Sequence, residues 1–385
     1  MERPPRKSAR VHLARRWLPD WSTANLVRET LRELQLVDDV ITLINGFCKQ
    51  QVVLIIGGYK KPEDFSSRVN KHGESMTLLS PEPTALKHGA VEVNKVWPLT
   101  SSNYQEEERT VCVIGQRLYK FNDTTDQLDV LDLDPTALSV PSIAWEGKIY
   151  DLITRGPIAV NQSIYLFCTN RLTADEGQPY HYNEGIPRVL VYHTDRRDAW
   201  AVKSTCPMLP YSCPTRAVAV KNSIYVLEES EINPSAAMAL LYSDEMRNDK
   251  LYEYATETDT WTKLQSRPGG TFKYGYASDA IGGFLYVCGG TTRWRNSAGG
   301  HMASCDRYNI EKGRWEKMPP LLFPRCSPMA AFADNTLLVM GGIGVRAHDG
   351  MRDDCERWDA QLDKWVLLPH IVLPHKMMGA ATVVL

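Results

Sequence analysis

After residue 50 the chain alternates short apolar runs with polar, glycine- or proline-containing turns. Two late segments share one order: an apolar run, a Gly-Gly doublet, a loop, an aromatic residue and, seven positions later, a Trp. They are Phe284–Gly290 with Tyr308 and Trp315, and Thr336–Gly342 with Trp358 and Trp365. Short runs rich in β-branched and aromatic residues, bounded by turn signals, predict strands rather than helices.

The Trp position recurs along the whole region. It is found at Trp97, Trp145, Trp200, Trp261, Trp315 and Trp365, at intervals of 48, 55, 61, 54 and 50 residues. Six units of about fifty residues, each with room for four strands, predict a ring of small antiparallel sheets. The glycine doublets predict sharp turns in crowded places, since only glycine accepts positive φ there without a Cβ clash.

The two ends of this region predict how the ring closes. The last residues, Met377–Leu385, have the pattern of a first strand, and Val53–Gly58 has that of a second strand. Pairing them would complete one sheet and remove two exposed edges. The expected fold is therefore all-β: a six-bladed propeller over residues 51–385, closed by the C-terminal strand.

Residues 1–50 have a different pattern. Apolar residues recur at helical spacing from Val27 to Phe47, with Ser22-Thr23 as a start signal and Asn45-Gly46 as a stop signal. This periodicity predicts a short α-helical segment in front of the propeller.

The repeat resembles that of the kelch family. The order of a helical segment followed by a propeller is similar to the Kelch-like subfamily, in which a BTB domain and a helical BACK domain precede the repeats. Residues 1–50 resemble the end of a BACK domain, and no BTB-like segment precedes them. The resemblance implies a protein-binding propeller that recognises substrates for a Cullin-3 ubiquitin ligase. Because the BTB domain makes most of the Cullin-3 contact in that family, binding to Cullin-3 is expected only indirectly or in a longer form. The alternative is an actin-binding or scaffolding kelch protein.

The resemblance also implies a binding face, lined by residues that follow the doublets and by a basic residue that opens the next unit. Its expected partner is a protein or an acidic peptide, because arginine holds carboxylates with two parallel hydrogen bonds. The implied residues are Tyr59, Lys60, Lys273, Thr291, Arg293, Trp294, Arg325, Arg346 and His348.

Charge and composition narrow the function further. The net charge is −2, which favours neither nucleic acid nor acidic membranes as partners, although the basic start, residues 1–16, leaves nucleic-acid binding or nuclear import as an alternative. The nine cysteines form no C-x-x-C pair, and the nine histidines show no metal-ligand spacing. We therefore expect no enzyme activity, cofactor or metal, and a cytoplasmic location with the nucleus as the alternative.

Overall fold

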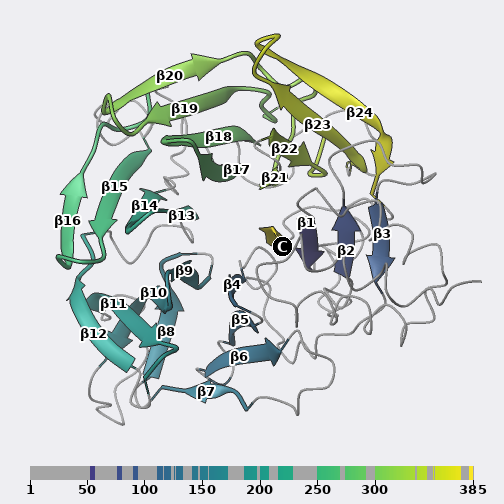
Figure 1. Cartoon of the computed structure of the whole chain (residues 1–385). Helices are drawn as coiled ribbons and strands as arrows, with labels where there is room; N and C mark the ends of the chain where they lie inside the picture. The colour runs from purple at the N-terminus through teal and green to yellow at the C-terminus, as the bar shows by residue number, and fades with distance from the viewer. Residues whose placement is uncertain are drawn as a thin grey trace, which may run out of the picture.

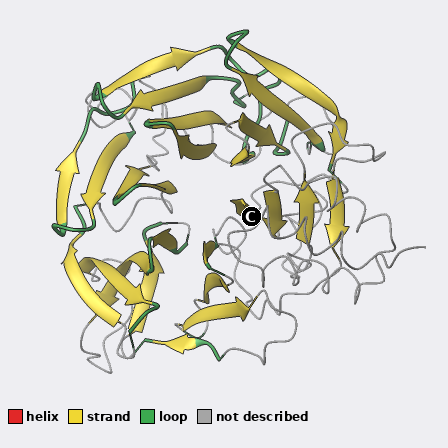
Figure 2. Cartoon of the chain, in the orientation of Figure 1, coloured by secondary structure: helices red, strands yellow, loops and turns green. Residues whose placement is uncertain are grey.

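The structure is a computed structural model, and every regular element that it describes is a strand. The described residues are 53–56, 76–79, 90–93, 111–115, 117–122, 125, 127–132, 141–145, 148–154, 156–171, 186–196, 200–207, 216–228, 249–268, 274–291, 300–333, 336–344, 350, 352–373 and 381–384. Their strands form antiparallel sheets arranged in a ring (Figures 1 and 2).

Five sheets are blades built from consecutive strands. The first contains β4 (Cys112–Ile114), β5 (Arg117–Asn122), β6 (Gln127–Asp132) and β7 (Ile143–Ala144). The second contains β8 (Lys148–Leu152), β9 (Ile158–Val160), β10 (Ser163–Arg171), β11 (Ile186–His193) and β12 (Trp200–Thr205), and here both β8 and β9 pair with β10. The third contains β13 (Arg216–Val220), β14 (Ser223–Glu228), β15 (Lys250–Ala255) and β16 (Thr260–Lys263). The fourth contains β17 (Tyr274–Ile281), β18 (Phe284–Thr291), β19 (Cys305–Asn309) and β20 (Arg314–Met318). The fifth contains β21 (Met329–Ala333), β22 (Thr336–Met340), β23 (Asp354–Asp359) and β24 (Lys364–Val372).

The remaining sheet joins the two ends of the repeat region. Its strands are β1 (Val53–Ile56), β2 (Met76–Leu79), β3 (Ala90–Val93) and β25 (Ala381–Val384), in the order β25-β1-β2-β3. Val53 pairs with Val384 and Ile56 with Ala381, so the predicted pairing of the C-terminal strand with Val53–Ile56 is confirmed.

The predicted fold, six blades preceded by a helical segment, is wrong as stated. Five blades have described side chains, whereas the sheet of β25 and β1–β3 is described by its strand pairing alone. The prediction of a sixth blade depends on Trp97, which lies outside the described residues. Residues 1–50, with the predicted helix and the predicted domain boundary, also lie outside them, and the described part contains no helix.

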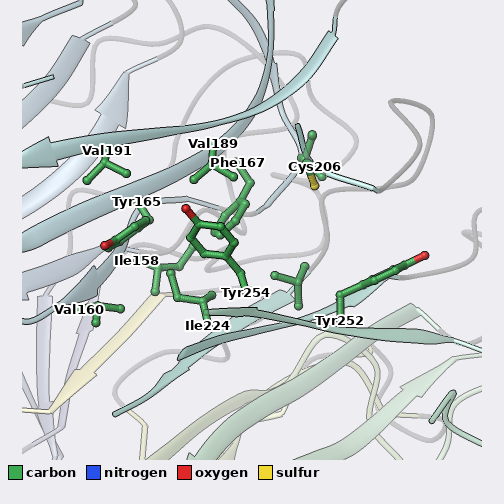
Figure 3. Close-up of a cluster of buried hydrophobic side chains, with 12 residues drawn as sticks. Ile158, Val160, Tyr165, Phe167, Val189, Val191, Cys206, Ile224, Tyr252 and Tyr254 are labelled. Carbon is green, nitrogen blue, oxygen red and sulfur yellow. The ribbon is translucent and has the colours of Figure 1, made fainter. Parts of the chain in front are cut away.

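The apolar core lies between neighbouring blades. One cluster combines Phe167 and Val189 of the second blade with Ile224 and Tyr254 of the third (Figure 3). The predicted aromatic pairs lie opposite each other on the third and fourth strands: Tyr308 with Trp315 at 5.3 Å and Trp358 with Trp365 at 5.5 Å between ring centroids. The two indoles also reach the preceding blade's connection, where Trp315 Nε1 donates to Gln265 O (2.8 Å) and Trp365 Nε1 to Pro319 O (2.9 Å). Trp315 and Trp365 therefore tie the fourth and fifth blades to the blades before them.

The glycine doublets enclose the connection between β20 and β21. A Cβ on Gly289 would lie 2.7 Å from Arg325 O, and a Cβ on Gly342 would lie 2.7 Å from Cys326 O. Both glycines have positive φ, +74° and +86°. The chain at Arg325 and Cys326 thus passes between two doublets from successive blades, which explains why glycine is needed at both.

A buried arginine fixes this connection to the last blade. Arg325 is fully buried, and its Nη2 donates to Glu356 Oε1 at 2.6 Å while its Nη1 donates to Gly341 O at 2.9 Å. Glu356 is also fully buried, and it accepts the backbone N–H groups of Leu322 (2.6 Å) and Phe323 (3.3 Å). Each guanidinium nitrogen of Arg325 and both carboxylate oxygens of Glu356 thus form at least one hydrogen bond, which is the condition under which a buried pair holds two elements together.

The interface between the third and fourth blades also contains a buried arginine that pairs with carboxylates. Arg267, 2% exposed, donates from Nε to Asp306 Oδ2 at 2.9 Å and from Nη1 to Asp249 Oδ2 at 3.3 Å. Asp306 occupies the place in β19 that Glu356 occupies in β23, each following a cysteine. Burial alone would raise the pKa of Asp306, but the charge of Arg267 and the hydrogen bond from Lys317 hold it below its ordinary value.

A third tie joins the inner strands of the last two blades. Asp279 in β17 accepts the backbone N–H of Phe332 in β21 at 2.8 Å and that of Ala280 at 2.8 Å. Burial outweighs these two hydrogen bonds and raises the pKa of Asp279 to about 6.

Replacing Gly342 should disrupt the enclosed connection. We expect Gly342→Ala to lower the free energy of unfolding by more than about 2 kcal/mol, because positive φ costs about 1–2 kcal/mol and the backbone oxygen must also move. Gly283→Ala is the control, since Gly283 has φ +79° but no atom within 4 Å of an added Cβ. Urea denaturation of both variants measures the difference, and equal losses would contradict the role of the close approach.

Removing Glu356 should leave the Arg325 charge buried without its carboxylate. We expect Glu356→Ala to lower the free energy of unfolding by about 3–5 kcal/mol. The matched control is Glu316→Ala, because Glu316 pairs with Arg307 at 3.0 Å where both side chains are partly exposed, at 21% and 33%. That change should cost less than about 1 kcal/mol. Thermal unfolding measures both variants. If they lose a similar amount of unfolding free energy, the buried pair stabilises the fold no more than the partly exposed pair does.

Asp279 should make stability depend on pH. Its folded pKa of about 6 lies above the ordinary 3.8, so the folded chain binds this proton more tightly than the unfolded chain. The stabilisation that this tighter proton binding adds to the free energy of unfolding is therefore complete below about pH 4. It declines as the pH rises to about 6 and does not change further above that. The difference in unfolding free energy between the wild type and Asp279→Asn, measured from pH 3.5 to 8, should follow this course. A flat difference would contradict it.

Candidate functional site

One end of the propeller gathers the long loops and the links between blades. In a four-stranded antiparallel blade, the loop after the second strand and the exit from the fourth strand lie at the same end. Hydrogen bonds confirm the arrangement: Gly290 N donates to Arg325 O at 2.8 Å, and Cys326 and Ile343 exchange bonds of 2.9 and 2.7 Å. We call this end, with the β18–β19 and β22–β23 loops and the connection 319–328, the connection face.

Both loops of the connection face are closed at their bases by backbone hydrogen bonds. In the β18–β19 loop, Met302 N donates to Gly290 O at 2.8 Å, and Thr291 forms an isolated bridge with His301. In the β22–β23 loop, Gly344 N donates to Gly350 O at 2.6 Å and Arg352 N to Gly342 O at 2.8 Å. Loops with fixed bases on a rigid scaffold are the usual carriers of binding residues.

The residues expected to line the binding face divide into two groups. Tyr59, Lys60, Lys273, Arg293, Trp294, Arg346 and His348 lie outside the described residues. The structure places the other two, Thr291 and Arg325, at the connection face, but both are buried, at 4% and 0% exposed. Thr291 lies at the base of its loop, and the Arg325 guanidinium is occupied by Glu356 and by backbone oxygens. This differs from the expected exposed position, because Arg325 presents no donor to an outside partner.

The connection 319–328 exposes apolar side chains at the connection face. Leu322 is 50% and Phe323 37% exposed, although both backbone N–H groups are fixed by Glu356. Arg352 lies over the Phe323 ring, with its guanidinium carbon 4.2 Å from the centroid. We name Leu322, Phe323 and Arg352 the connection patch.

Arg352 also belongs to an ion-pair chain that leads inward. Its Nε donates to Asp354 Oδ1 at 2.9 Å, and Asp354 lies 3.1 Å from Arg325 Nη1. Burial would raise the pKa of Asp354, but the hydrogen bond from Arg352 and the charge of Arg325 lower it below its ordinary value. Asp354 therefore holds the partly exposed guanidinium of Arg352 and connects it to the buried Arg325.

The three residues of the connection patch are not among the binding residues predicted from the sequence. The available signal was the apolar run Leu321-Leu322-Phe323 between Pro320 and Pro324, in a connection that has no strand to bury it. Leu321 is buried at 3%, so the run alone does not show which of its members face outward.

The described residues can be compared with the requirements of metal binding and of a cysteine nucleophile. Within them, no group of three or more His, Cys, Asp or Glu side chains is placed to hold a metal ion. Burial raises the pKa of the Cys112 and Cys355 thiols well above their ordinary value, which makes them poor nucleophiles. A search of the same residues finds no helix with the length and apolar character that crossing a membrane requires.

Comparison with known proteins agrees with the repeat seen in the structure. Residues 273–322, which include β17 to β20, match the Kelch motif. The chain is 25% identical over 123 residues to an F-box/kelch-repeat protein of Arabidopsis thaliana, covering 32% of this chain and 26% of that protein. It is 31% identical over 107 residues to Kelch-like protein 26 of Mus musculus, covering 28% of this chain and 16% of that protein. It is 22% identical over 182 residues to Kelch repeat protein C2 of vaccinia virus, and this match covers 47% of this chain and 29% of that protein.

The matched parts span less than a third of each of these relatives. The solved structure of YjhT aligns with a TM-score of 0.48 and 14% identity, over 71% of this chain and 85% of that chain. The chain thus carries a kelch repeat, forms a β-propeller and is similar to kelch-repeat proteins, a class that generally acts by binding other proteins.

Proposed function

We propose that the connection face binds a segment of another protein, and that the chain is the substrate-recognition part of a Cullin-3 ubiquitin ligase adaptor. The observation that carries the binding proposal is the connection patch. It exposes Leu322 and Phe323 on a backbone that a buried ion pair holds still, between two loops with closed bases. A fixed apolar surface loses little conformational entropy on binding.

The patch favours a partner segment with both apolar and acidic residues. Phe323 and Leu322 offer apolar area, and Arg352 adds a positive charge that is 22% exposed. Aromatic and arginine side chains together are typical of binding hot spots. The loops that leave the same face carry Arg293, Trp294, Arg346 and His348 in sequence, which adds to the same preference.

The adaptor role rests on weaker support than binding does. It is favoured by the resemblance of residues 1–50 to the end of a BACK domain and by the similarity to Kelch-like protein 26. In that subfamily Cullin-3 is bound mainly through the BTB domain. We therefore propose that this chain reaches Cullin-3 through a full-length relative or in a longer form, with an actin-binding or scaffolding role as the alternative.

Affinity capture from cell extract tests the binding proposal. The wild type is compared with Leu322→Ser/Phe323→Ser and with Arg293→Ala/Arg346→Ala. We expect each double variant to lose at least about tenfold of the specifically bound protein, since a lost hot spot costs about 2 kcal/mol or more. The control is Leu362→Ser, because Leu362 is 58% exposed in the β23–β24 turn at the opposite end of the propeller.

The outcomes separate the two parts of the proposal. Capture that is unchanged in both double variants, or equally reduced by Leu362→Ser, would exclude the connection face as the binding surface. Capture that depends on the face but never includes Cullin-3, even when a full-length Kelch-like relative is present, would exclude the adaptor role. Co-sedimentation with filamentous actin, lost in the face variants, would favour the alternative.

A further inference from the structure

Two cysteines lie directly opposite each other in the fourth blade. Cys288 in β18 is the register partner of Cys305 in β19. Both side chains are 1% exposed and belong to the apolar cluster that contains Tyr286 and Met318. Partners in register have side chains on the same face of the sheet, so the two thiols share one buried space.

The pair occupies the closer of the two kinds of antiparallel position. Gly289 N donates to Ser304 O at 3.0 Å, and Ile310 N donates to Gly283 O at 3.0 Å. Because hydrogen-bonded and non-hydrogen-bonded pairs alternate, Cys288 and Cys305 form a non-hydrogen-bonded pair, for which the Cα atoms lie about 4.5 Å apart. That separation is within the range of about 4.4–6.8 Å that a disulfide accepts.

From this placement we infer that Cys288 and Cys305 form a modification site: a dithiol that a hydroperoxide oxidises to a disulfide between β18 and β19. The disulfide product adds no atom to the buried space, since one S–S bond replaces two S–H hydrogen atoms. The disulfide would close a covalent ring around residues 289–304. This segment includes the β18–β19 loop and the hydrogen bonds at its base.

The reaction balances with one peroxide. The thiolate of one cysteine attacks a peroxide oxygen, the O–O bond breaks, and the leaving hydroxide takes a proton to become water while the sulfur becomes a sulfenic acid. The sulfur of the second cysteine then attacks the sulfenic sulfur, the S–O bond breaks and a second water leaves. Two thiols are oxidised by two electrons in total, and the peroxide is reduced to two waters.

Burial sets the rate of this reaction. It raises the pKa of Cys288 well above its ordinary value, and the hydrogen bond with the Cys305 thiol adds to the effect. The Cys288 thiol is therefore protonated. Both thiols are buried in the closed blade, so oxidation proceeds through local opening of β19 and β20. The site is slow to react and is protected from further oxidation once the disulfide has formed.

The fifth blade has the same pair of positions with only one cysteine. Cys355 occupies the place of Cys305, and its register partner is Met340. Gly341 N donates to Asp354 O at 3.1 Å, so this pair too is non-hydrogen-bonded. Met340→Cys would therefore create the same geometry in a second blade.

The test uses the full chain, reduced and then treated with hydrogen peroxide. Remaining thiols are alkylated in denaturant, and the digested peptides are analysed by mass spectrometry. We expect a peptide in which Cys288 is linked to Cys305, with the loss of two hydrogen masses, in the wild type. It should be absent from Cys305→Ser and Cys288→Ala, and Met340→Cys should gain a second link, to Cys355. The linked wild type should melt several degrees higher than the reduced form, and dithiothreitol should reverse both changes.

Three results would overturn the inference. In the first, a peroxide dose that links position 340 of the Met340→Cys variant to Cys355 produces no link between Cys288 and Cys305. Another is the absence of both links, because the same geometry predicts both. The third is a link that forms only when the chain is denatured before oxidation.

Discussion

The ring depends on a buried charge pair that is set between glycines. Arg325 and Cys326 lie in the connection between two blades, where Arg325 O is too close to Gly289 and Cys326 O too close to Gly342 for either glycine to carry a Cβ. The Arg325 side chain binds Glu356 of the next blade. An unpaired guanidinium at this depth would cost several kcal/mol, so the two blades can associate only in the register that brings the carboxylate to it. Arg267 does the same one interface earlier with Asp249 and Asp306. The apolar cores between blades supply most of the stabilisation, while these pairs specify how successive blades align.

Stability and the proposed recognition of a partner depend on the same segment of this molecule. The carboxylate that neutralises Arg325 also holds the backbone of Leu322 and Phe323, whose side chains project from the face. Asp354 links the same arginine to Arg352, which lies on the Phe323 ring. The buried pair therefore does not meet a partner itself, yet it sets the position of the groups that are available to one. A substitution at Arg325 would change binding through the fold, which separates its role from that of a contact residue.

Repetition makes equivalent positions comparable, and the differences between them are informative. Asp306 and Glu356 place a carboxylate at the same site in the fourth and fifth blades, whereas the equivalent residue of the third blade is Tyr252. Cys305 and Cys355 keep a thiol one position earlier, but their partners are Cys288 and Met340. The backbone thus provides the same close pair twice, and a single side chain decides whether it can become a covalent link.

The strands, the positive-φ doublets, the aromatic pairs of the last blades and the pairing of Val53–Ile56 with the C-terminal strand could be predicted from the sequence, because each follows from local periodicity, residue type or the order of the repeat. The burial of Arg325 could not be predicted in this way, because it depends on packing between blades. Its carboxylate lies 31 residues further along the chain, and nothing local distinguishes a buried arginine from an exposed one. At the preceding interface the arginine that is buried is Arg267, six positions before Lys273, where the repeat places its basic residue. The number of blades with described packing and the outward position of Leu322 and Phe323 also came from the structure, since both depend on which neighbouring blade covers a side chain.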